Sequence, residues 1–310
     1  MTNKLYLHVD LDDHLLDQLK DALPENCVLI GMNDPRNYES FAKCDMVFGN
    51  VPLEWVLAST TLRWIQLQST GTDPYIDRLS EIKDRGITLT NLYDFFGHAV
   101  SETALAGILA LKRGIDRLVL LKNEACWLGS ALRPSLSLLH ESKAIILGAG
   151  SIGQATKKLL VTFGTEVLLY DINPSIADIS TLEELDRKIP LADLVVTCLP
   201  DNTQTRNLFD ENRLSLLSAK SIYVNVGRAS VVDEAALIRF LHQKRIAGAV
   251  LDVTSLEPLP GDHDLWKCPN VILTQHSGGG WNGEMKQKVA YFLDNLQRYL
   301  RGDALSGTVT

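Results

Sequence analysis

Residues 143–171 read KAIILGAGSIGQATKKLLVTFGTEVLLYD, and this segment is the most informative about the architecture of the chain. Its first apolar run, Ala144–Leu147, has the length and composition of a strand buried on both faces. Three glycines follow, then an amphipathic helical pattern, and a second apolar run, Val167–Tyr170, ends at Asp171. Strand, glycine turn, helix, strand and acid, in this order, are typical of a βαβ unit that binds a dinucleotide.

Each glycine of this turn has its own physical role. Gly148 permits the tight turn, Gly150 lets the backbone approach a pyrophosphate, and Gly153 lets the helix pack closely on the first strand. The N–H groups and partial positive charge of the helix N-terminus attract phosphates. Asp171 lies roughly 20 residues farther on, where an acid binds the adenosine ribose and repels a 2′-phosphate. We therefore expect the turn to bind NAD(H) rather than NADP(H). The alternative is that the glycine turn is purely structural and binds no dinucleotide.

Length and composition indicate an intracellular protein that is large enough for two domains. A chain of 310 residues is long enough for two domains. The net charge of −8, without clusters of Lys and Arg, argues against a nucleic-acid partner. The five cysteines are scattered and form no CxxC pair, so we expect neither disulfides nor a metal site. No apolar run approaches the roughly 20 residues that span a bilayer, and no signal peptide is visible at the start, so we expect a cytoplasmic protein.

The first hundred residues alternate between strand-like and helical patterns, which predicts a parallel, doubly wound α/β sheet. The predicted strands are Lys4–Val9, Val28–Gly31, Met46–Phe48, Arg63–Gln66 and Ile87–Thr90, and a helix is expected over His14–Leu23. The fourth strand leads into a small polar loop, Gln68–Asp73, whose backbone N–H groups could hold an anion. Taken alone, this loop is better explained as a plain turn.

A long apolar helical pattern covers His98–Asn123. Ala, Leu, Ile and Val recur there at intervals of three and four residues, so we predict a helix that is buried on more than one face. Such a helix suits a connection between domains or a subunit interface. The following stretch, Glu124–Glu141, has little periodicity and is expected to form a loop or short turns.

Four further strands are predicted after Asp171: Leu194–Leu199, Ser221–Val226, Ala249–Val253 and Val271–Thr274. Arg228, Glu257 and His276 each follow the end of one of the last three. Ligands on such sheets bind at the carboxyl ends of the strands. Taken alone, Arg228 is more simply a surface charge, Glu257 a loop carboxylate and His276 a structural histidine. Together, beside a dinucleotide turn, they indicate one reaction site.

These three side chains support a specific reaction. An Arg fork binds a carboxylate, and an imidazolium donates a proton to an alkoxide at neutral pH. A carboxylate beside the histidine favours its charged form and fixes its ring. With hydride from NADH, the set predicts interconversion of a 2-oxo acid and a 2-hydroxy acid.

The chain resembles the D-isomer-specific 2-hydroxyacid dehydrogenases, which include glyoxylate/hydroxypyruvate reductases. The resemblance covers nearly the whole chain, through the segments 69–73, 97–102, GAGSIG with Asp171, NVGRA at 225–229, LDVTSLEPLP at 251–260 and TQHSGG at 274–279. It implies that Arg228 binds the substrate carboxylate together with the backbone of Thr70 and Gly71. It further implies that His276 is the general acid/base and Glu257 is its partner.

The resemblance also implies the cofactor contacts, the domain order and the assembly. NAD(H) is expected to contact the turn at Gly148, Gly150, Ser151, Ile152 and Gly153, and also Asp171, Cys198, Leu199, Pro200, Val226, Gly227 and Asp252. A Rossmann NAD-binding domain, 98–282, is inserted into a flavodoxin-like substrate domain, 1–97 and 283–310. The family implies a homodimer built largely on the nucleotide domain and the helix at 98–123.

Four residues depart from the family pattern: Ser69, Ala229, Thr254 and Gln275. They remove no catalytic group, but they leave the identity of the 2-oxo acid open. An NAD(H)-sensing binding protein or co-repressor on the same fold is the alternative from another functional class. An NADPH-preferring reductase is disfavoured by Asp171, and a formate dehydrogenase by the lack of further pocket groups.

Overall fold

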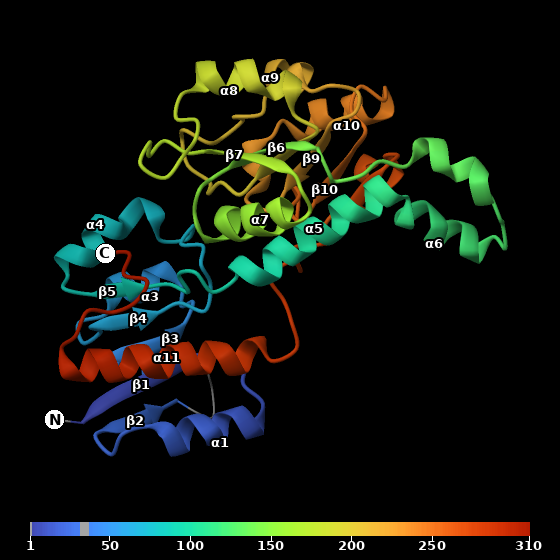
Figure 1. The fold of residues 1–310 in the computed structure, drawn as a ribbon. Helices are drawn as coiled ribbons and strands as arrows, with labels where there is room; N and C mark the ends of the chain where they lie inside the picture. Colours follow the sequence, from blue (N-terminus) through green and yellow to red (C-terminus); the bar gives the residue numbers. More distant parts are fainter. Residues whose placement is uncertain (1, 32–36) are drawn as a thin grey trace. The chain divides into compact units, whose positions relative to one another are not determined.

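The computed structural model describes residues 2–31 and 37–310, and the chain divides into two units. The first unit comprises Met1–Phe95 and Trp281–Thr310, and the second comprises Phe96–Gly280. Each unit is built around its own parallel β-sheet (Figure 1).

The sheet of the first unit has the strand order β2-β1-β3-β4-β5, and all its pairs are parallel. This is the order of the flavodoxin-like doubly wound fold, so that prediction is confirmed. The elements are β1 Asn3–His8, α1 Asp13–Ala22, β2 Cys27–Ile30, α2 Tyr38–Phe41, β3 Met46–Gly49, α3 Leu53–Ala58, β4 Trp64–Gln66, α4 Leu79–Asp84, β5 Thr88–Thr90 and α11 Glu284–Arg301, with a 3₁₀ turn at Ile76–Arg78.

The C-terminal helix α11 completes the core of the first unit (Figure 1). Its Phe292 is fully buried and stacks on Phe48 of β3, with ring centroids 4.6 Å apart, and on Trp64 of β4. Asn295 of the same helix donates to the buried side-chain oxygen of Gln66 at 2.7 Å. The two ends of the chain therefore share one core.

The second unit has a sheet of six parallel strands in the order β11-β10-β9-β8-β6-β7. Its strands are β6 Lys143–Leu147, β7 Glu166–Tyr170, β8 Leu194–Thr197, β9 Ile222–Asn225, β10 Gly248–Leu251 and β11 Val271–Leu273. An isolated parallel bridge joins Tyr170 to Ile179 on the free side of β7. It stands where the third strand of a Rossmann sheet would lie. The predicted Rossmann fold is confirmed, with that strand reduced to one bridge.

The second unit also contains helices, most of which cover the two faces of its sheet. They are α5 Gly97–Arg113, α6 Ile115–Asn123, α7 Ser151–Thr162, α8 Leu182–Lys188, α9 Glu211–Leu216 and α10 Glu234–His242, with 3₁₀ turns at Gly129–Ser135, Ile189–Leu191, Ala229–Val231 and Asp264–Lys267. On one face, α5 packs closely because Gly107 has no side chain: a Cβ there would lie 2.5 Å from Val250 of β10. The opposite face is covered by α8, α9 and α10 (Figure 1).

The prediction of a single helix over 98–123 is wrong, because the helix is interrupted at Gly114. Gly114 has φ 65°, and its N–H donates to the last carbonyls of α5, which ends that helix in a left-handed cap. The next helix, α6, buries none of its residues. It carries exposed apolar side chains at Ile115, Leu118, Val119 and Leu120. Within this unit, α6 leads away from the sheet (Figure 1).

Two further findings concern the described part of the chain. No helix there is long and apolar enough to cross a bilayer. The five cysteines are all free thiols. Burial raises the pKa of Cys44 and of Cys198 to about 12, so both thiols stay neutral and poorly nucleophilic at neutral pH.

Candidate active site

Arg228, Glu257 and His276 follow three neighbouring strands of the second unit. Arg228 comes after β9, Glu257 after β10, and His276 after β11, and these strands are adjacent in the sheet. Because the strands are parallel, their carboxyl ends lie at one edge. The structure therefore brings the three predicted residues to the same edge of one sheet.

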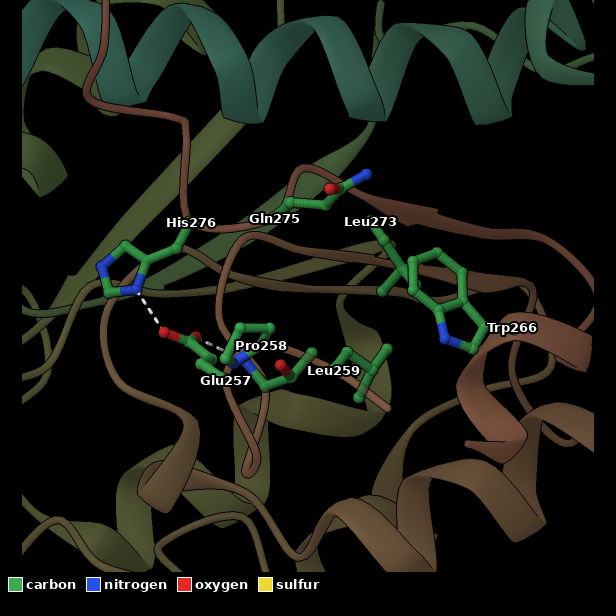
Figure 2. A pocket seen from close by; sticks show the side chains of 8 residues that line it. Glu257, Pro258, Leu259, Trp266, Leu273, Gln275 and His276 are labelled. Atoms are coloured by element: carbon green, nitrogen blue, oxygen red, sulfur yellow. Dashed lines mark hydrogen bonds and ion pairs between the residues drawn. The ribbon is translucent and has the colours of Figure 1, made fainter. Parts of the chain in front are cut away.

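The imidazole of His276 is paired with the carboxylate of Glu257 (Figure 2). Nδ1 of His276 lies 2.6 Å from Oε2 of Glu257, and Oε1 of Glu257 accepts the N–H of Thr254 at 3.0 Å. A carboxylate only accepts, so Nδ1 carries the proton and Nε2 is directed away from the pair. No described residue forms a hydrogen bond with Nε2. The geometry leaves this nitrogen available for proton exchange with a ligand.

The turn that carries His276 has unusual backbone geometry. Gln275 and His276 have φ values of 55° and 54°, a left-handed conformation that non-glycine residues rarely adopt. Asp252, only 5% exposed, holds this turn. Its carbonyl accepts the N–H of His276 at 2.6 Å, and its Oδ1 accepts from the hydroxyl of Thr274 and from the N–H of Gly278. The position of His276 thus depends on a buried carboxylate.

The turn that carries Arg228 is fixed by Asn225, the last residue of β9. The side chain of Asn225 accepts the N–H of Gly227 at 3.1 Å and donates to the carbonyl of Arg228 at 3.0 Å. Gly227 lies against the backbone of Leu199, so closely that a Cβ would come within 2.6 Å of its carbonyl oxygen. Only glycine fits this position.

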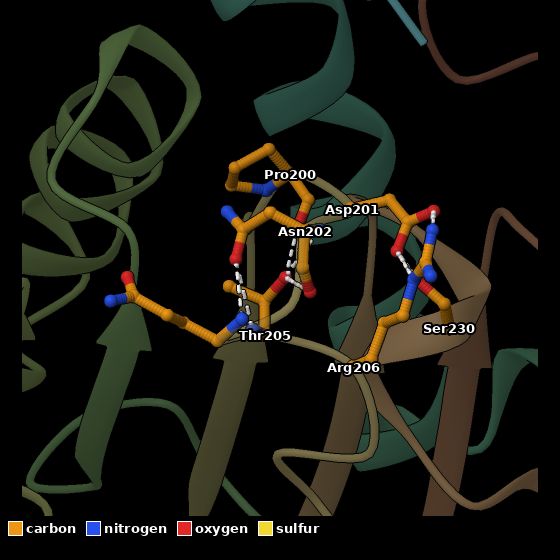
Figure 3. A network of polar contacts seen from close by, with 7 residues as sticks. Pro200, Asp201, Asn202, Thr205, Arg206 and Ser230 are labelled. Carbon is orange, nitrogen blue, oxygen red and sulfur yellow. Dashed lines mark hydrogen bonds and ion pairs between the residues drawn. The ribbon is translucent and has the colours of Figure 1, made fainter. Parts of the chain in front are cut away.

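Asp201 ties the same turn to the loop after β8 (Figure 3). It accepts from Nε of Arg206 at 2.8 Å and from the hydroxyl of Ser230, two residues beyond Arg228, at 2.8 Å. The hydrogen bonds from Arg206 and Ser230 hold the pKa of Asp201 below its usual range. Asp201 is therefore ionised at neutral pH and holds two loops of this edge together.

The glycine turn after β6 has the geometry that the sequence predicts. Gly148 has φ 98°, and a Cβ on Gly153 would lie 1.9 Å from the carbonyl oxygen of Gly148, so neither position accepts a side chain. Gly150 faces open space, because a Cβ added to it would meet no atom within 4 Å. Ser151 and Ile152 begin α7, and no side chain caps the first N–H groups of this helix. The turn can accommodate a pyrophosphate against bare backbone.

Asp171 lies at the end of β7, beside the glycine turn. Its Oδ2 accepts the N–H of Ala149 at 2.9 Å, and its Oδ1 accepts the N–H of Asn173 at 3.0 Å. Each carboxylate oxygen has a second lone pair, so the group can also accept from a ribose hydroxyl. The chemistry of these donors and acceptors fits a dinucleotide.

A cavity of about 560 Å³ opens beside Asp171. Its walls include Leu199 and Pro200 from the loop after β8, and also Ile172, Thr205 and Leu208. Mostly apolar walls with a few polar groups suit a nucleoside. Cys198 and Val226 do not line this cavity. Both lie at strand ends, where Val226 is buried and Cys198 packs against Gly148.

Thr70 and Gly71 belong to the first unit, in the loop after β4. Asn50 accepts the N–H of Gln68 at 3.0 Å and donates to the hydroxyl of Ser69, and Asn91 donates to the carbonyl of Thr70 at 2.7 Å. No described residue accepts from the backbone N–H groups of Thr70 or Gly71. The loop therefore presents free donors on a fixed backbone.

A second cavity, of about 420 Å³, lies beside the histidine pair (Figure 2). Pro258, Leu259, Trp266 and Leu273 give it apolar walls, with the imidazole of His276 at one end and Trp266 at the other. In Figure 2 the Nε2 side of the ring points away from this space.

The sequence did not single out Asn225, Asp201 or Asn50. Asn225 stands two positions before Gly227, and an Asn at a strand end is a recognised turn signal. Asp201 has partners up to 29 positions away, which no local spacing reveals. In the described residues, no group of three or more His, Cys, Asp or Glu side chains could hold a metal ion.

Comparison with known proteins identifies related chains. Residues 105–278 match the family model of the D-isomer specific 2-hydroxyacid dehydrogenase, NAD binding domain. A glyoxylate reductase of Pyrococcus horikoshii is 34% identical over 273 residues, which are 83% of this chain and 76% of the relative. A glyoxylate/hydroxypyruvate reductase A of Escherichia fergusonii is 27% identical over 306 residues, covering 95% and 93% of the two chains.

A solved structure supports the same comparison over the full length. A D-isomer specific 2-hydroxyacid dehydrogenase family protein from Aeromonas salmonicida aligns with a TM-score of 0.86 at 25% identity. The alignment covers 100% of this chain and 99% of that chain. The sequence comparisons and the structural comparison therefore both relate the chain to D-isomer specific 2-hydroxyacid dehydrogenases.

Proposed function

Because the chain belongs to the D-isomer specific 2-hydroxyacid dehydrogenase family and is thus an NAD-dependent oxidoreductase, we propose that it interconverts a small 2-oxo acid and its D-2-hydroxy acid. The observation that carries this proposal is the 2.6 Å pairing of His276 with Glu257, at the sheet edge that also bears Arg228. Reduction of a ketone needs a hydride and a proton, and this pair can supply the proton.

We assign substrate binding to Arg228 and to the backbone of Thr70 and Gly71. A guanidinium fork binds a carboxylate through two parallel hydrogen bonds. The free N–H groups of Thr70 and Gly71 are suitable donors for the same anion. The clamp formed by Asn225 keeps the Arg228 turn in one conformation, which lowers the entropy lost on binding.

His276 is assigned as the general acid/base. In reduction, its Nε2 gives a proton to the oxygen of the former carbonyl group, and in oxidation it takes the proton from the hydroxyl group. Glu257 holds Nδ1 and thereby fixes the orientation of the ring. Bound NADH supplies the hydride.

We assign the cofactor contacts to the second unit. Backbone N–H groups of the turn from Gly148 to Gly153 would hold the pyrophosphate, and Asp171 the adenosine ribose. Leu199 and Pro200 would cover the adenosine part. The predicted contacts of Cys198, Val226, Gly227 and Asp252 remain proposals. Asp171 favours NADH because a 2′-phosphate there would meet a carboxylate.

The relatives suggest the substrate class. Those reported above are named glyoxylate reductase and glyoxylate/hydroxypyruvate reductase, so we propose glyoxylate and hydroxypyruvate as the first substrates to test. We also propose a cytoplasmic homodimer. Free thiols fit a reducing compartment, and the exposed apolar residues of α6 form the surface that a second copy would cover.

A substrate screen tests the proposed function. Glyoxylate, hydroxypyruvate and pyruvate are each supplied with NADH and with NADPH, and cofactor oxidation is followed. We expect turnover with at least one acid, faster with NADH, and a KM for the acid raised at least about 100-fold in Arg228→Gln. Tight NADH binding without turnover of any 2-oxo acid would instead favour the NAD(H)-sensing alternative.

A further inference from the structure

The loop Thr254–Pro260, which carries Glu257, forms no helix or strand. Glu257 itself is exposed, so burial does not fix its position. We propose that Glu234, a residue outside the assigned catalytic set, is the positioning residue that holds this loop and thereby keeps Glu257 against His276. The inference rests on the proposed function for its kinetic consequence, but its structural part can be tested without any substrate.

Glu234 binds the loop through Ser255, two residues before Glu257. Its Oε2 accepts the backbone N–H of Ser255 at 2.9 Å, and its Oε1 accepts the hydroxyl of Ser255 at 2.5 Å. One carboxylate therefore takes both donors of one residue, which fixes the backbone and the side chain of Ser255 together. Hydrogen bonds to a charged acceptor are stronger than those between neutral groups.

The anchor is rigid because Glu234 opens α10. The side chain of Asp233 caps this helix by accepting the N–H of Ala236 at 2.9 Å. Leu237 and Phe240 are buried against the sheet. The side chain of Glu234 is itself only 12% exposed. A nearly buried charge on a packed helix has little freedom to move, unlike the loop that it holds.

His263 supplies a second contact to the same carboxylate. Its Nδ1 accepts the N–H of Leu265 at 3.3 Å, which places the proton of a neutral ring on Nε2. Nε2 lies 3.5 Å from Oε1 of Glu234. Because His263 also donates its backbone N–H to the carbonyl of Pro260 at 3.0 Å, Glu234 is connected to both ends of the loop.

Between these anchors, Glu257 is the residue through which the loop contacts His276. Glu257 accepts the N–H of Thr254 with Oε1 and contacts His276 with Oε2. Releasing Ser255 would free the segment from Thr254 to Glu257 as a unit. A displacement of about 1 Å at a catalytic group can cost up to about 100-fold in rate. The structure thus gives Glu234 an indirect but specific effect on proton transfer.

The test compares Glu234→Ala, Glu234→Gln, Ser255→Ala and the double variant Glu234→Ala/Ser255→Ala in the full chain. Glu211→Ala is the matched control, because Glu211 also opens a helix of this unit, α9, and pairs with Arg239 at 2.9 Å without touching the loop. Hydrogen exchange of residues 254–260 is measured by mass spectrometry. The kcat and KM for 2-oxo acid reduction and the Kd for NADH are then determined.

We expect Glu234→Ala to speed exchange in residues 254–260 by about tenfold or more. It should lower kcat by about 10- to 100-fold and leave the Kd for NADH within about twofold. Glu234→Gln keeps one acceptor oxygen, so its kcat should fall less than that of Glu234→Ala. The kcat of the double variant should be little lower than that of Glu234→Ala, because both substitutions remove the same contact. Glu211→Ala should behave as wild type.

Unchanged exchange in the loop of Glu234→Ala would overturn the proposal, even if no substrate of the wild type had been found. Equal losses in kcat and in NADH binding would also overturn it, because they would indicate general damage to the unit. If Glu234→Ala does not fold, the same criteria apply to Glu234→Gln. Faster loop exchange in an otherwise inactive wild type would support the anchoring role and reject the proposed function alone.

Discussion

The carbonyl oxygen of Asp252 accepts the backbone N–H of His276 at 2.6 Å, and its side chain binds the residues on either side of that turn. An acid at this position was expected to contact the cofactor. In the structure, it holds the left-handed backbone of Gln275 and His276. The proposed general acid is therefore fixed from two directions, by Asp252 through its backbone and by Glu257 through its ring.

Substitution of Asp252 tests this support. Asp252→Ala leaves the hydroxyl of Thr274 and the N–H of Gly278 without their acceptor in a buried site. We expect it to lower the free energy of unfolding of the second unit by about 1–3 kcal/mol. Urea titration measures this change. Asp252→Asn keeps an acceptor oxygen and should lose less, while identical midpoints for Asp252→Ala and wild type would refute the supporting role.

Substitution of Gln275 by glycine, unlike that of Asp252 by alanine, is expected not to lower stability. Its φ of 55° costs a non-glycine residue about 1 kcal/mol, which glycine avoids. Gln275→Gly should therefore keep or raise the melting temperature. Gln275→Pro should lower both stability and activity, because the proline ring fixes φ near −65°. A fully active, stable Gln275→Pro variant would show that the left-handed turn is not required.

Cofactor preference depends on Asp171. Without its carboxylate, a 2′-phosphate no longer meets a negative charge, and the ribose loses an acceptor. Asp171→Ala should narrow the ratio of kcat/KM for NADH over NADPH by about tenfold. Glu166→Ala, at the exposed opposite end of β7, is the control. The assignment is rejected if the ratio is the same in Asp171→Ala and wild type.

Asp201 predicts a pH dependence of stability. Its pKa is lowered in the folded chain by Arg206 and Ser230, so its contribution is complete above the ordinary Asp pKa of about 3.9. The contribution is lost as the pH falls through the lower folded value. We expect Asp201→Asn to melt below wild type at pH 7 and the difference to shrink below about pH 4. A constant difference down to pH 3 would argue against this origin.

Much of this fold follows from local sequence patterns. Apolar runs located every named strand within two residues, because strands covered on both faces are mostly apolar. The rule that ligands bind at the carboxyl ends of parallel strands brought Arg228, Glu257 and His276 to one edge. Their pairing could be expected from residue chemistry alone.

Other features depend on contacts between distant residues or on single backbone angles. Lys112 and Arg113 before Gly114 form a helix-end signal, yet the apolar periodicity continues beyond Gly114 and conceals the break. Glu234 and Ser255 are 21 positions apart, and nothing in the spacing joins them. The left-handed φ of Gln275 is imposed by its hydrogen-bonded neighbours rather than by its own residue type.

The most direct test of the central claim is the rate of hydride transfer in a single turnover of His276→Ala, with saturating NADH and a 2-oxo acid that the wild type reduces. His14→Ala, an exposed histidine on α1 of the first unit, is the control. We expect His276→Ala to bind NADH as wild type does but to transfer hydride about 10²- to 10⁴-fold more slowly. A His276→Ala variant that reduces the acid at the wild-type rate would contradict it.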